Sequence, residues 1–293
     1  MKFLVTGAAG LIGQQITYDL TQQNHEVYSC YHEDIPIHGI PIELDLAISE
    51  KIIQTIQKIK PDVVIHLGAI TNVDLCETQK DLAYKINAKS TEILAKESAK
   101  IDAFFVYIST DYVFDGTKQM KKENDTPNPL GYYGKTKLDG EISLNNMASS
   151  WAIARTSTPF GIHAKKKSFP IWVKDNLELK KPIKVLTDQY TSPTYVPNLS
   201  KMIIEVATKK INGIIHLAGS SRLSRYDFAM KIAEKLGLDK SLLLEAKFKD
   251  MDWKARRPQD SSLDVTLASK LLNEKPQTIE QSLSLFIKDL TNQ

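Results

Sequence analysis

Residues 2–13 read KFLVTGAAGLIG, an apolar run that leads into three glycines at Gly7, Gly10 and Gly13. The run is typical of a buried parallel strand, and a helical stretch follows at residues 14–23. Glycines permit a tight turn and a close approach of the backbone to a pyrophosphate, while the helix N-terminus offers free N–H groups and a partial positive charge. A plain glycine turn is the alternative. The order strand, glycine turn, helix favours a dinucleotide site.

Strands and helices alternate along the first half of the chain. Apolar stretches predict buried strands, and amphipathic stretches predict the helices between them. The expected strands are residues 2–6, 26–31, 41–46, 61–69 and 103–108, and the expected helices include 14–23, 49–60 and 81–100. This alternation predicts an α/β fold with a Rossmann-type, doubly wound parallel sheet, in which ligands bind outside the carboxyl ends of the strands.

The second half does not read as one separate C-terminal domain. Residues 151–155 continue the strands, and a buried strand returns at residues 213–217 after an amphipathic helix. We therefore expect an NAD(P)-binding Rossmann domain and a smaller, discontinuous substrate-binding lobe. The expected domain comprises residues 1–159 and about 197–217, and the expected lobe comprises about 160–196 and 218–293.

Composition and charge narrow the classes of function. The 293 residues are 42% hydrophobic and 25% charged, as in a globular protein with a sizeable core. The 38 Lys and Arg against 35 Asp and Glu give a net charge of +3, which is too weak to indicate a nucleic acid polymer as partner. The basic triplet at residues 165–167 reads as a solvated loop rather than as a phosphate patch.

The cysteines and the lengths of the apolar runs bear on where in the cell the protein is expected to lie. Cys30 and Cys76 fit no disulfide or metal framework, so no metal site is expected. No apolar run reaches the roughly 18–20 residues that span a bilayer, and the chain opens without a signal-peptide pattern. We expect a cytoplasmic protein that does not bind membranes.

Two polar pairs are candidates for chemistry at the ligand edge of the sheet. Ser109 and Thr110 follow an expected strand, where a hydroxyl can donate to a substrate carbonyl, although such residues also make caps and turns. Tyr133 and Lys137 lie four residues apart, so in a helix they share one face. An ammonium beside a phenol lowers the phenol pKa toward the range of a general acid or base. The alternative is a surface Tyr packed on a solvated Lys.

These motifs occur in one chain, and together they resemble those of extended short-chain dehydrogenase/reductases. Several further runs are similar to those of dTDP-4-dehydrorhamnose reductases. They are residues 69–74 (AITNVD), 109–114 (STDYVF), 133–138 (YGKTKL), 188–194 (DQYTSPT) and 257–258 (RP). The runs at 112–117 (YVFDGT) and 133–141 are also similar to the regulatory β subunit of methionine adenosyltransferase.

The resemblance to the reductases implies NAD(P)H-dependent reduction of a 4-keto-6-deoxy nucleotide sugar in deoxysugar (dTDP-L-rhamnose) biosynthesis. It implies a catalytic triad of Thr110, Tyr133 and Lys137. The residues expected to bind the cofactor are Gly7, Gly10, Leu11, Ile12, Gly13, Tyr31, His32, Asp45, Leu46, Leu67, Gly68, Ala69, Thr71, Asn87, Tyr133 and Lys137. Those expected to bind the substrate are Val73, Asp74, Asp111, Tyr112 and Arg257.

The end of the second expected strand bears on the choice of cofactor. An acidic residue there favours NAD and a basic one favours NADP, whereas the run Cys30-Tyr31-His32-Glu33 fits neither rule cleanly. The expected cofactor is therefore NADPH or NADH, with a slight preference for NADPH.

One departure from the reductase pattern bears on the sugar. The rhamnose reductases carry Arg-Thr-Ser-Trp after the sixth strand, with the Trp against the sugar, whereas Thr158 stands at that position here. One alternative is a non-catalytic, NADP-binding regulatory subunit with a synthetase partner, and another is a nucleotide-sugar epimerase. A dehydratase is disfavoured, because Tyr112 replaces the usual Glu. The oligomeric state, a homodimer included, and a metal at a subunit contact stay open.

Overall fold

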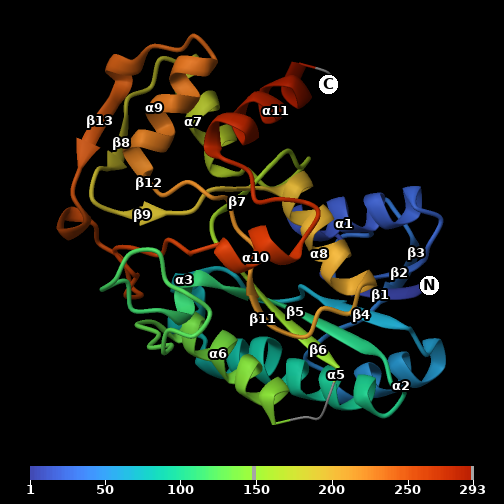
Figure 1. Ribbon diagram of the computed structural model, residues 1–293. Coiled ribbons are helices and arrows are strands. Elements are labelled where there is room, and N and C mark those ends of the chain that lie inside the picture. The colour runs from blue at the N-terminus through green and yellow to red at the C-terminus, as the bar shows by residue number, and fades with distance from the viewer. Residues whose placement is uncertain (147–149, 292–293) are drawn as a thin grey trace.

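The computed structural model describes residues 1–146 and 150–291. Its centre is one parallel sheet in the order β11-β6-β5-β4-β1-β2-β3, in the lower half of Figure 1. The strands are β1 (Lys2–Thr6), β2 (Glu26–Tyr31), β3 (Ile40–Glu43), β4 (Val63–His66), β5 (Phe104–Thr110), β6 (Trp151–Thr156) and β11 (Gly213–His216). Strand order reverses between β1 and β4, where a crevice for ligands opens in such sheets. The expected doubly wound α/β fold is confirmed.

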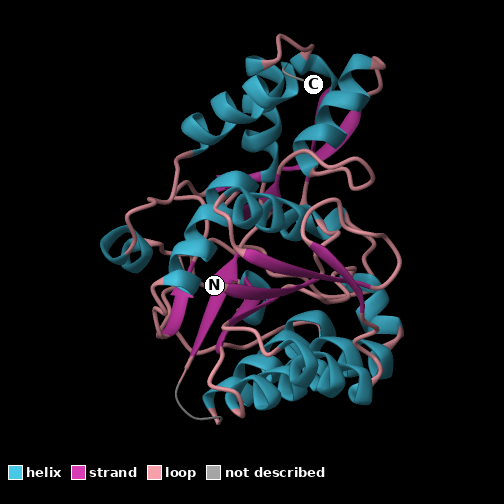
Figure 2. Cartoon of the chain, turned by 90° about the vertical axis from the view of Figure 1, so that its right-hand side faces the viewer, coloured by secondary structure: helices cyan, strands magenta, loops and turns pink. Residues whose placement is uncertain are grey.

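Helices cover both faces of the sheet, as Figure 2 shows above and below the strands. Successive side chains of a strand point to opposite faces, so Phe3 and Val5 join one apolar layer and Leu4 joins the other. The first layer includes α1 (Leu11–Gln22), α8 (Val196–Thr208) and α10 (Thr266–Leu271). The second includes α2 (Ser49–Ile59), α5 (Ser90–Ala99) and α6 (Tyr132–Asn145). Within the described residues, no helix has the length and apolar character needed to cross a membrane.

A second apolar core lies beyond the sheet, in the upper part of Figure 1. The rings of Phe228 and Phe286 pack edge-on against Phe160, with centroids 5.3 and 5.6 Å away. The helices of this core are α7 (Phe169–Glu178), α9 (Arg225–Lys235) and α11 (Ile279–Thr291). Short strand pairs accompany them: β7 (Pro159–Phe160) with β10 (Thr194–Tyr195), β9 (Tyr190–Thr191) with β12 (Leu223–Ser224), and β8 (Ile183–Leu186) with β13 (Leu243–Ala246). The last two pairs join segments from either side of α8.

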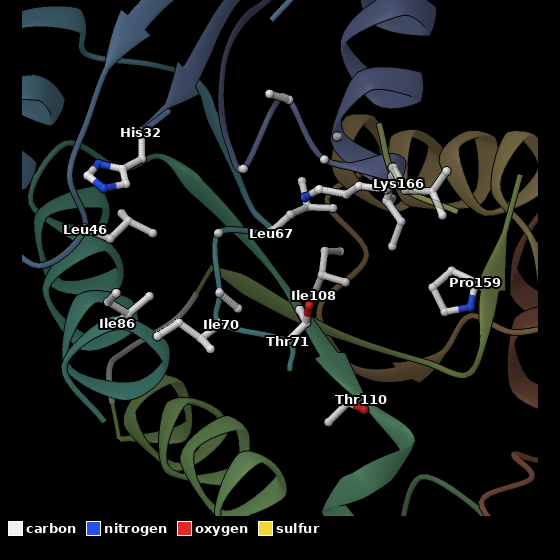
Figure 3. A pocket seen from close by; sticks show the side chains of 18 of the residues that line it. His32, Leu46, Leu67, Ile70, Thr71, Ile86, Ile108, Thr110, Pro159 and Lys166 are labelled. Carbon is white, nitrogen blue, oxygen red and sulfur yellow. The ribbon is translucent and has the colours of Figure 1, made fainter. Parts of the chain in front are cut away.

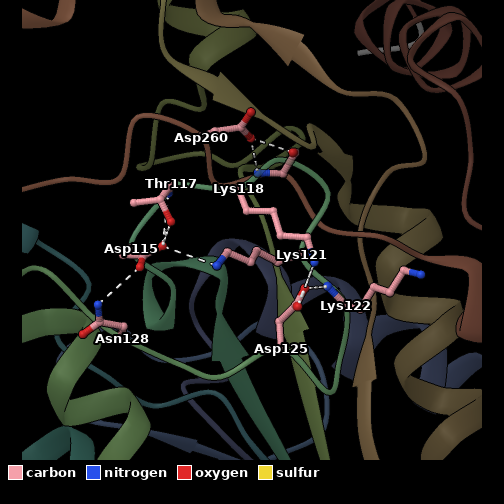
Figure 4. Close-up of polar contacts among 9 residues, drawn as sticks. Asp115, Thr117, Lys118, Lys121, Lys122, Asp125, Asn128 and Asp260 are labelled. Carbon is pink, nitrogen blue, oxygen red and sulfur yellow. Dashed lines mark hydrogen bonds and ion pairs between the residues drawn. The ribbon is translucent and has the colours of Figure 1, made fainter.

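Charged contacts order the long connection from β5 to α6 (Figure 4). Lys118 Nζ donates a hydrogen bond to Asp125 Oδ1 at 2.9 Å. The Asp115 carboxylate accepts from Asn128 Nδ2 at 3.2 Å and forms an ion pair with Lys121 at 3.4 Å. These contacts fold the connection back on itself, so that α6 begins beside the carboxyl end of β5.

A buried ion pair then fixes α6 against the sheet. The Arg155 guanidinium of β6 donates to both carboxylate oxygens of Glu141 on α6, at 2.9 and 2.6 Å. Ser109 Oγ of β5 donates to the same carboxylate at 2.5 Å. Arg155 and Glu141 are each only 1% exposed. Bidentate geometry and a third donor satisfy charges that would otherwise be costly to bury.

We predict that Glu141→Ala lowers the free energy of unfolding by about 3–5 kcal/mol, because it leaves the Arg155 guanidinium buried without its partner. Urea denaturation measures the loss. Glu178→Ala, which breaks an exposed pair with Lys174, is the control and should cost less than about 1 kcal/mol. Equal losses in the two variants would show that the buried pair does not hold α6 in place.

Candidate functional site

A cavity of about 710 Å³ opens at the carboxyl ends of the central strands (Figure 3). It is lined by most of the residues expected to bind the cofactor. They come from the loops after β1, β2, β3 and β4, from the end of β2, from the first turn of α1 and from α6. They are Gly7, Gly10, Leu11, Ile12, Gly13, Tyr31, His32, Asp45, Leu46, Leu67, Gly68, Ala69, Thr71, Tyr133 and Lys137. Thr110 and Asp111, at the end of β5, line it too. Residues far apart in the sequence therefore meet where a doubly wound sheet binds its ligand.

The glycine turn after β1 requires residues without side chains. Gly7 has φ +65°, a conformation that other residues rarely adopt, and a Cβ there would lie 2.9 Å from Gly68 N. A Cβ on Gly13 would overlap the Gly7 carbonyl oxygen. Gly10 is the N-cap of α1 and supplies no capping side chain. The turn therefore presents bare backbone and the N-terminus of α1 to the cavity, which suits a pyrophosphate.

A buried polar chain supports this turn from behind. Thr6 Oγ1 lies 2.6 Å from His66 Nδ1 and accepts hydrogen bonds from Leu67 N and Gly68 N at 3.1 and 3.0 Å. His66 Nε2 lies 3.0 Å from Thr91 Oγ1, and His66 is fully buried. Burial lowers the pKa of His66 well below its usual value, so the ring is neutral and positions the loop after β4.

Thr110 and Tyr133 meet at the cavity floor. The Thr110 hydroxyl donates to Asp111 Oδ1 at 3.0 Å and accepts from Tyr112 N at 3.2 Å. Burial raises the pKa of the Tyr133 phenol well above its usual value, while a hydrogen bond with the Thr110 side chain acts in the opposite direction. A phenol in this environment keeps its proton at neutral pH. It can therefore act as a general acid toward an oxygen that gains negative charge.

Lys137 lies one helical turn after Tyr133 and is 3% exposed. Its Nζ donates to the Ile108 carbonyl at 2.8 Å and lies 4.1 Å from the centre of the Tyr107 ring. Burial lowers the pKa of this ammonium to about 7, with the Glu141 carboxylate acting in the opposite direction. Lys137 therefore lines the cavity, as its spacing from Tyr133 predicts, and its buried surroundings disfavour the charged form of its amine.

Asn87 lies within Lys85–Lys89, a π-helical turn that interrupts the helix expected over residues 81–100. Its side chain accepts from Ile70 N at 2.8 Å and donates to the Ile70 carbonyl at 3.0 Å and to Thr136 Oγ1 at 3.1 Å. All its polar atoms are thereby used within the protein, and Asn87 does not line the cavity. The structure places it as a brace between the loop after β4 and α6 rather than in the cavity wall.

The remaining residues expected to bind the substrate gather outside the cavity, at the start of α3 (Val73–Thr78). Asp74 accepts from both terminal nitrogens of Arg257, at 3.2 and 2.9 Å, and this hydrogen bonding holds the pKa of Asp74 below its usual value. The Arg257 guanidinium stacks 4.4 Å from the ring of Trp253. Tyr112, whose ring packs edge-on against Tyr133 at 6.0 Å, links this group to the cavity.

Three further residues of the cavity wall are not among those expected to bind the cofactor or the substrate. Thr156, at the end of β6 beside Thr110, is 7% exposed, and its hydroxyl is without a hydrogen-bond partner among the described residues. Thr158 adopts φ +43°, a strained conformation for a β-branched residue. Lys166 enters from the segment between β7 and α7. An unpaired buried hydroxyl and a side-chain-free glycine turn in one cavity fit a dinucleotide, which offers both amide and phosphate groups.

No group of three or more His, Cys, Asp or Glu side chains is placed to hold a metal ion within residues 1–146 and 150–291.

Comparison with known proteins agrees with this geometry. The sequence profile of the RmlD substrate binding domain matches residues 1–292. A "probable low-salt glycan biosynthesis reductase" of Haloferax volcanii is 32% identical, over 97% of this chain and 96% of its own length. A dTDP-4-dehydrorhamnose reductase of Aggregatibacter actinomycetemcomitans is 31% identical, over 96% and 97%. The methionine adenosyltransferase 2 subunit beta of Rattus norvegicus is 32% identical, over 90% and 80%.

Solved structures of dTDP-4-dehydrorhamnose reductases are similar to this chain along nearly its whole length. A hypothetical dTDP-4-dehydrorhamnose reductase of Sulfolobus tokodaii is 38% identical with a TM-score of 0.87, over 95% of this chain and 97% of that one. A dTDP-4-dehydrorhamnose reductase of Bacillus anthracis, in complex with NADP, is 29% identical with a TM-score of 0.90, over 99% and 100%. The resemblances to the reductases and to the β subunit are both confirmed.

We predict that Lys137→Met stabilises the protein most at low pH. The amine titrates at 10.5 without burial and at about 7 in the fold, so the folded chain binds fewer protons between these values and its stability rises with pH there. Removing the buried charge should raise the free energy of unfolding by about 2 kcal/mol at pH 6 and by much less at pH 10. Urea denaturation at the two pH values measures this, and a gain that is independent of pH would contradict the burial of an ammonium.

Proposed function

The chain belongs to the RmlD substrate binding domain family, and from this premise we propose that it is an NAD(P)H-dependent oxidoreductase that reduces the ketone of a nucleotide sugar. One observation carries the proposal: Thr110, Tyr133 and Lys137 line the same cavity as the glycine turn. A general acid therefore lies in the same space as a site shaped for a dinucleotide. We propose a 4-keto-6-deoxy nucleotide sugar as the substrate, as in dTDP-L-rhamnose biosynthesis.

The chain's own residues account for the proton side of the reaction. A bound nicotinamide supplies the hydride. The Tyr133 phenol donates its proton to the carbonyl oxygen as negative charge grows there, and the Thr110 hydroxyl donates a hydrogen bond to the same oxygen. The Lys137 ammonium provides a positive charge one turn from Tyr133, which favours the phenolate left after proton transfer. In the free protein the Thr110 hydroxyl donates its one proton to the buried Asp111 carboxylate, which also accepts from Ser157. On substrate binding this hydroxyl turns from Asp111 to the carbonyl oxygen.

The two apolar cores suggest that one part of the chain binds the cofactor and the other binds the sugar. We propose that residues 1–159 with about 197–217 bind NAD(P), and that about 160–196 with 218–293 bind the sugar. The separate core around Phe160 supports this division. Asp74 and Arg257 bring charged groups to the start of α3, next to the cavity. The Arg257 guanidinium would meet the diphosphate of a nucleotide sugar only by exchanging its paired donors from Asp74 to the phosphate oxygens. Thr158 stands where the rhamnose reductases have a Trp against the sugar. The smaller Thr side chain would contact less of the sugar ring.

The proposal is tested by following oxidation of NADPH and of NADH. The substrate is the 4-keto-6-deoxy sugar that dTDP-glucose dehydratase and its 3,5-epimerase produce. Turnover that depends on the keto sugar supports the proposal, and the ratio of the two rates gives the cofactor preference. Cofactor binding with no turnover of this or related keto sugars would overturn it.

A second candidate function is a regulatory subunit, because the rat β subunit is as similar as the reductases are. Stable association with a methionine adenosyltransferase, together with NADP binding and no keto-sugar reduction, would support this alternative. An epimerase would retain its nicotinamide through purification, whereas a reductase must exchange it at each turnover.

We predict that Tyr133→Phe reduces kcat by about 10²–10⁴-fold while the dissociation constant for NADPH stays within about twofold, because only the proton donor is removed. Tyr132→Phe is the matched control, since the Tyr132 ring packs near Lys80 and Lys135 outside the cavity. It should retain full activity. Full activity in Tyr133→Phe would exclude this phenol as the general acid.

A further inference from the structure

Residues 161–168, here called the strap, run from β7 to α7 and lie against the glycine turn. His163 Nδ1 accepts from the backbone N–H groups of Lys165 and Lys166, each at 3.1 Å. An atom that accepts two hydrogen bonds carries no proton, so the ring proton is on Nε2, which lies 3.0 Å from the Ala9 carbonyl and donates to it. At the other end, Lys165 forms an ion pair with Asp34, after β2. Side chains thus attach the strap across the cavity mouth.

The three lysines of the strap differ in their partners. Lys165 is paired with Asp34, and Lys167 is paired with Asp175 at 2.6 Å. For Lys166 between them, neither a hydrogen bond nor an ion pair of its ammonium is found within residues 1–146 and 150–291. All three lysines are exposed, as the solvated loop expected from the sequence implies, and Lys166 and Lys167 also line the cavity.

Lys166 points into the cavity instead (Figure 3). Its Nζ lies 3.8 Å from the position that a Cβ on Gly10 would occupy, which is contact distance, so the ammonium lies directly against the glycine turn. Asp34 lies within electrostatic range, but its carboxylate accepts from Lys165. In the free protein the Lys166 ammonium and the N-terminus of α1 therefore lie side by side at the glycine turn. Two adjacent positive poles favour a multiply charged anion at this turn.

We propose that Lys166 binds the pyrophosphate of the nicotinamide dinucleotide and that the strap thereby holds the cofactor against the glycine turn. The inference rests on the proposed function. The position of Lys166 against Gly10 assigns it to the pyrophosphate rather than to a 2′-phosphate, which would lie near Tyr31 and His32 at the end of β2. Because NADH and NADPH share the pyrophosphate, Lys166 contributes equally to the binding of both. Release of cofactor then requires the strap to leave Gly10.

Isothermal titration of NADPH, NADH and adenosine into the wild-type protein and into Lys166→Gln tests this assignment. We expect the dissociation constants of NADPH and NADH to rise by the same factor, about tenfold, and that of adenosine, which has no phosphate, to stay unchanged. Lys166→Arg should restore most of the loss. Lys181→Gln removes the same charge from an exposed position after α7 and is the matched control, with no expected effect.

Two results would overturn the assignment. Unchanged binding of both cofactors by Lys166→Gln would show that Lys166 is a solvated side chain without a role in cofactor binding. A loss confined to NADPH would show that Lys166 contacts the 2′-phosphate instead of the pyrophosphate. Failure of the proposed function is distinguishable from these. A wild-type protein that binds both cofactors but reduces no keto sugar loses the proposed activity, while the role of Lys166 stands or falls on the titrations. A wild-type protein that binds neither cofactor overturns both.

Discussion

The close approach of two backbone turns is the constraint on which the site depends. Gly7 and Gly68 follow neighbouring parallel strands, and the space between them has no room for a Cβ. Thr6 and His66 hold the turns together by a buried polar chain that needs a neutral imidazole. Because both turns end at the point where strand order reverses, any ligand of the sheet must lie against them. The cavity, the strap and the position of α6 are arranged around this contact.

Burial of polar groups couples the site to the stability of the fold. The Arg155–Glu141 pair is satisfied on all sides and fixes α6, so a large energetic cost of burial is offset by geometry. Lys137 and Thr156 differ, because burial penalises the ammonium of the first and the hydroxyl of the second is unpaired among the described residues. A bound ligand could supply the hydrogen-bond or charge partner that these two groups lack in the free protein.

Local patterns predict the sheet, the glycine turn and the Tyr133–Lys137 pair, because each depends on residues within one turn or strand. The family resemblance supplies the rest of the expected cavity wall. Sequence reasoning did not identify Lys166 or Thr156 and did not foresee that Arg257 pairs with Asp74. Each of these depends on which distant segments meet, and single-sequence spacing carries no information on that.

Transfer of deuterium tests the central claim most directly, namely that this cavity carries out hydride reduction with Tyr133 as the proton donor. The protein is incubated with the keto sugar and NAD(P)H deuterated at the transferring position of the nicotinamide, and the sugar product is analysed by mass spectrometry. We expect one deuterium on the carbon that held the carbonyl, and labelled product from Tyr133→Phe only at a rate about 10²–10⁴-fold lower. A reduced sugar without deuterium, or labelled product formed at the normal rate by Tyr133→Phe, would contradict it.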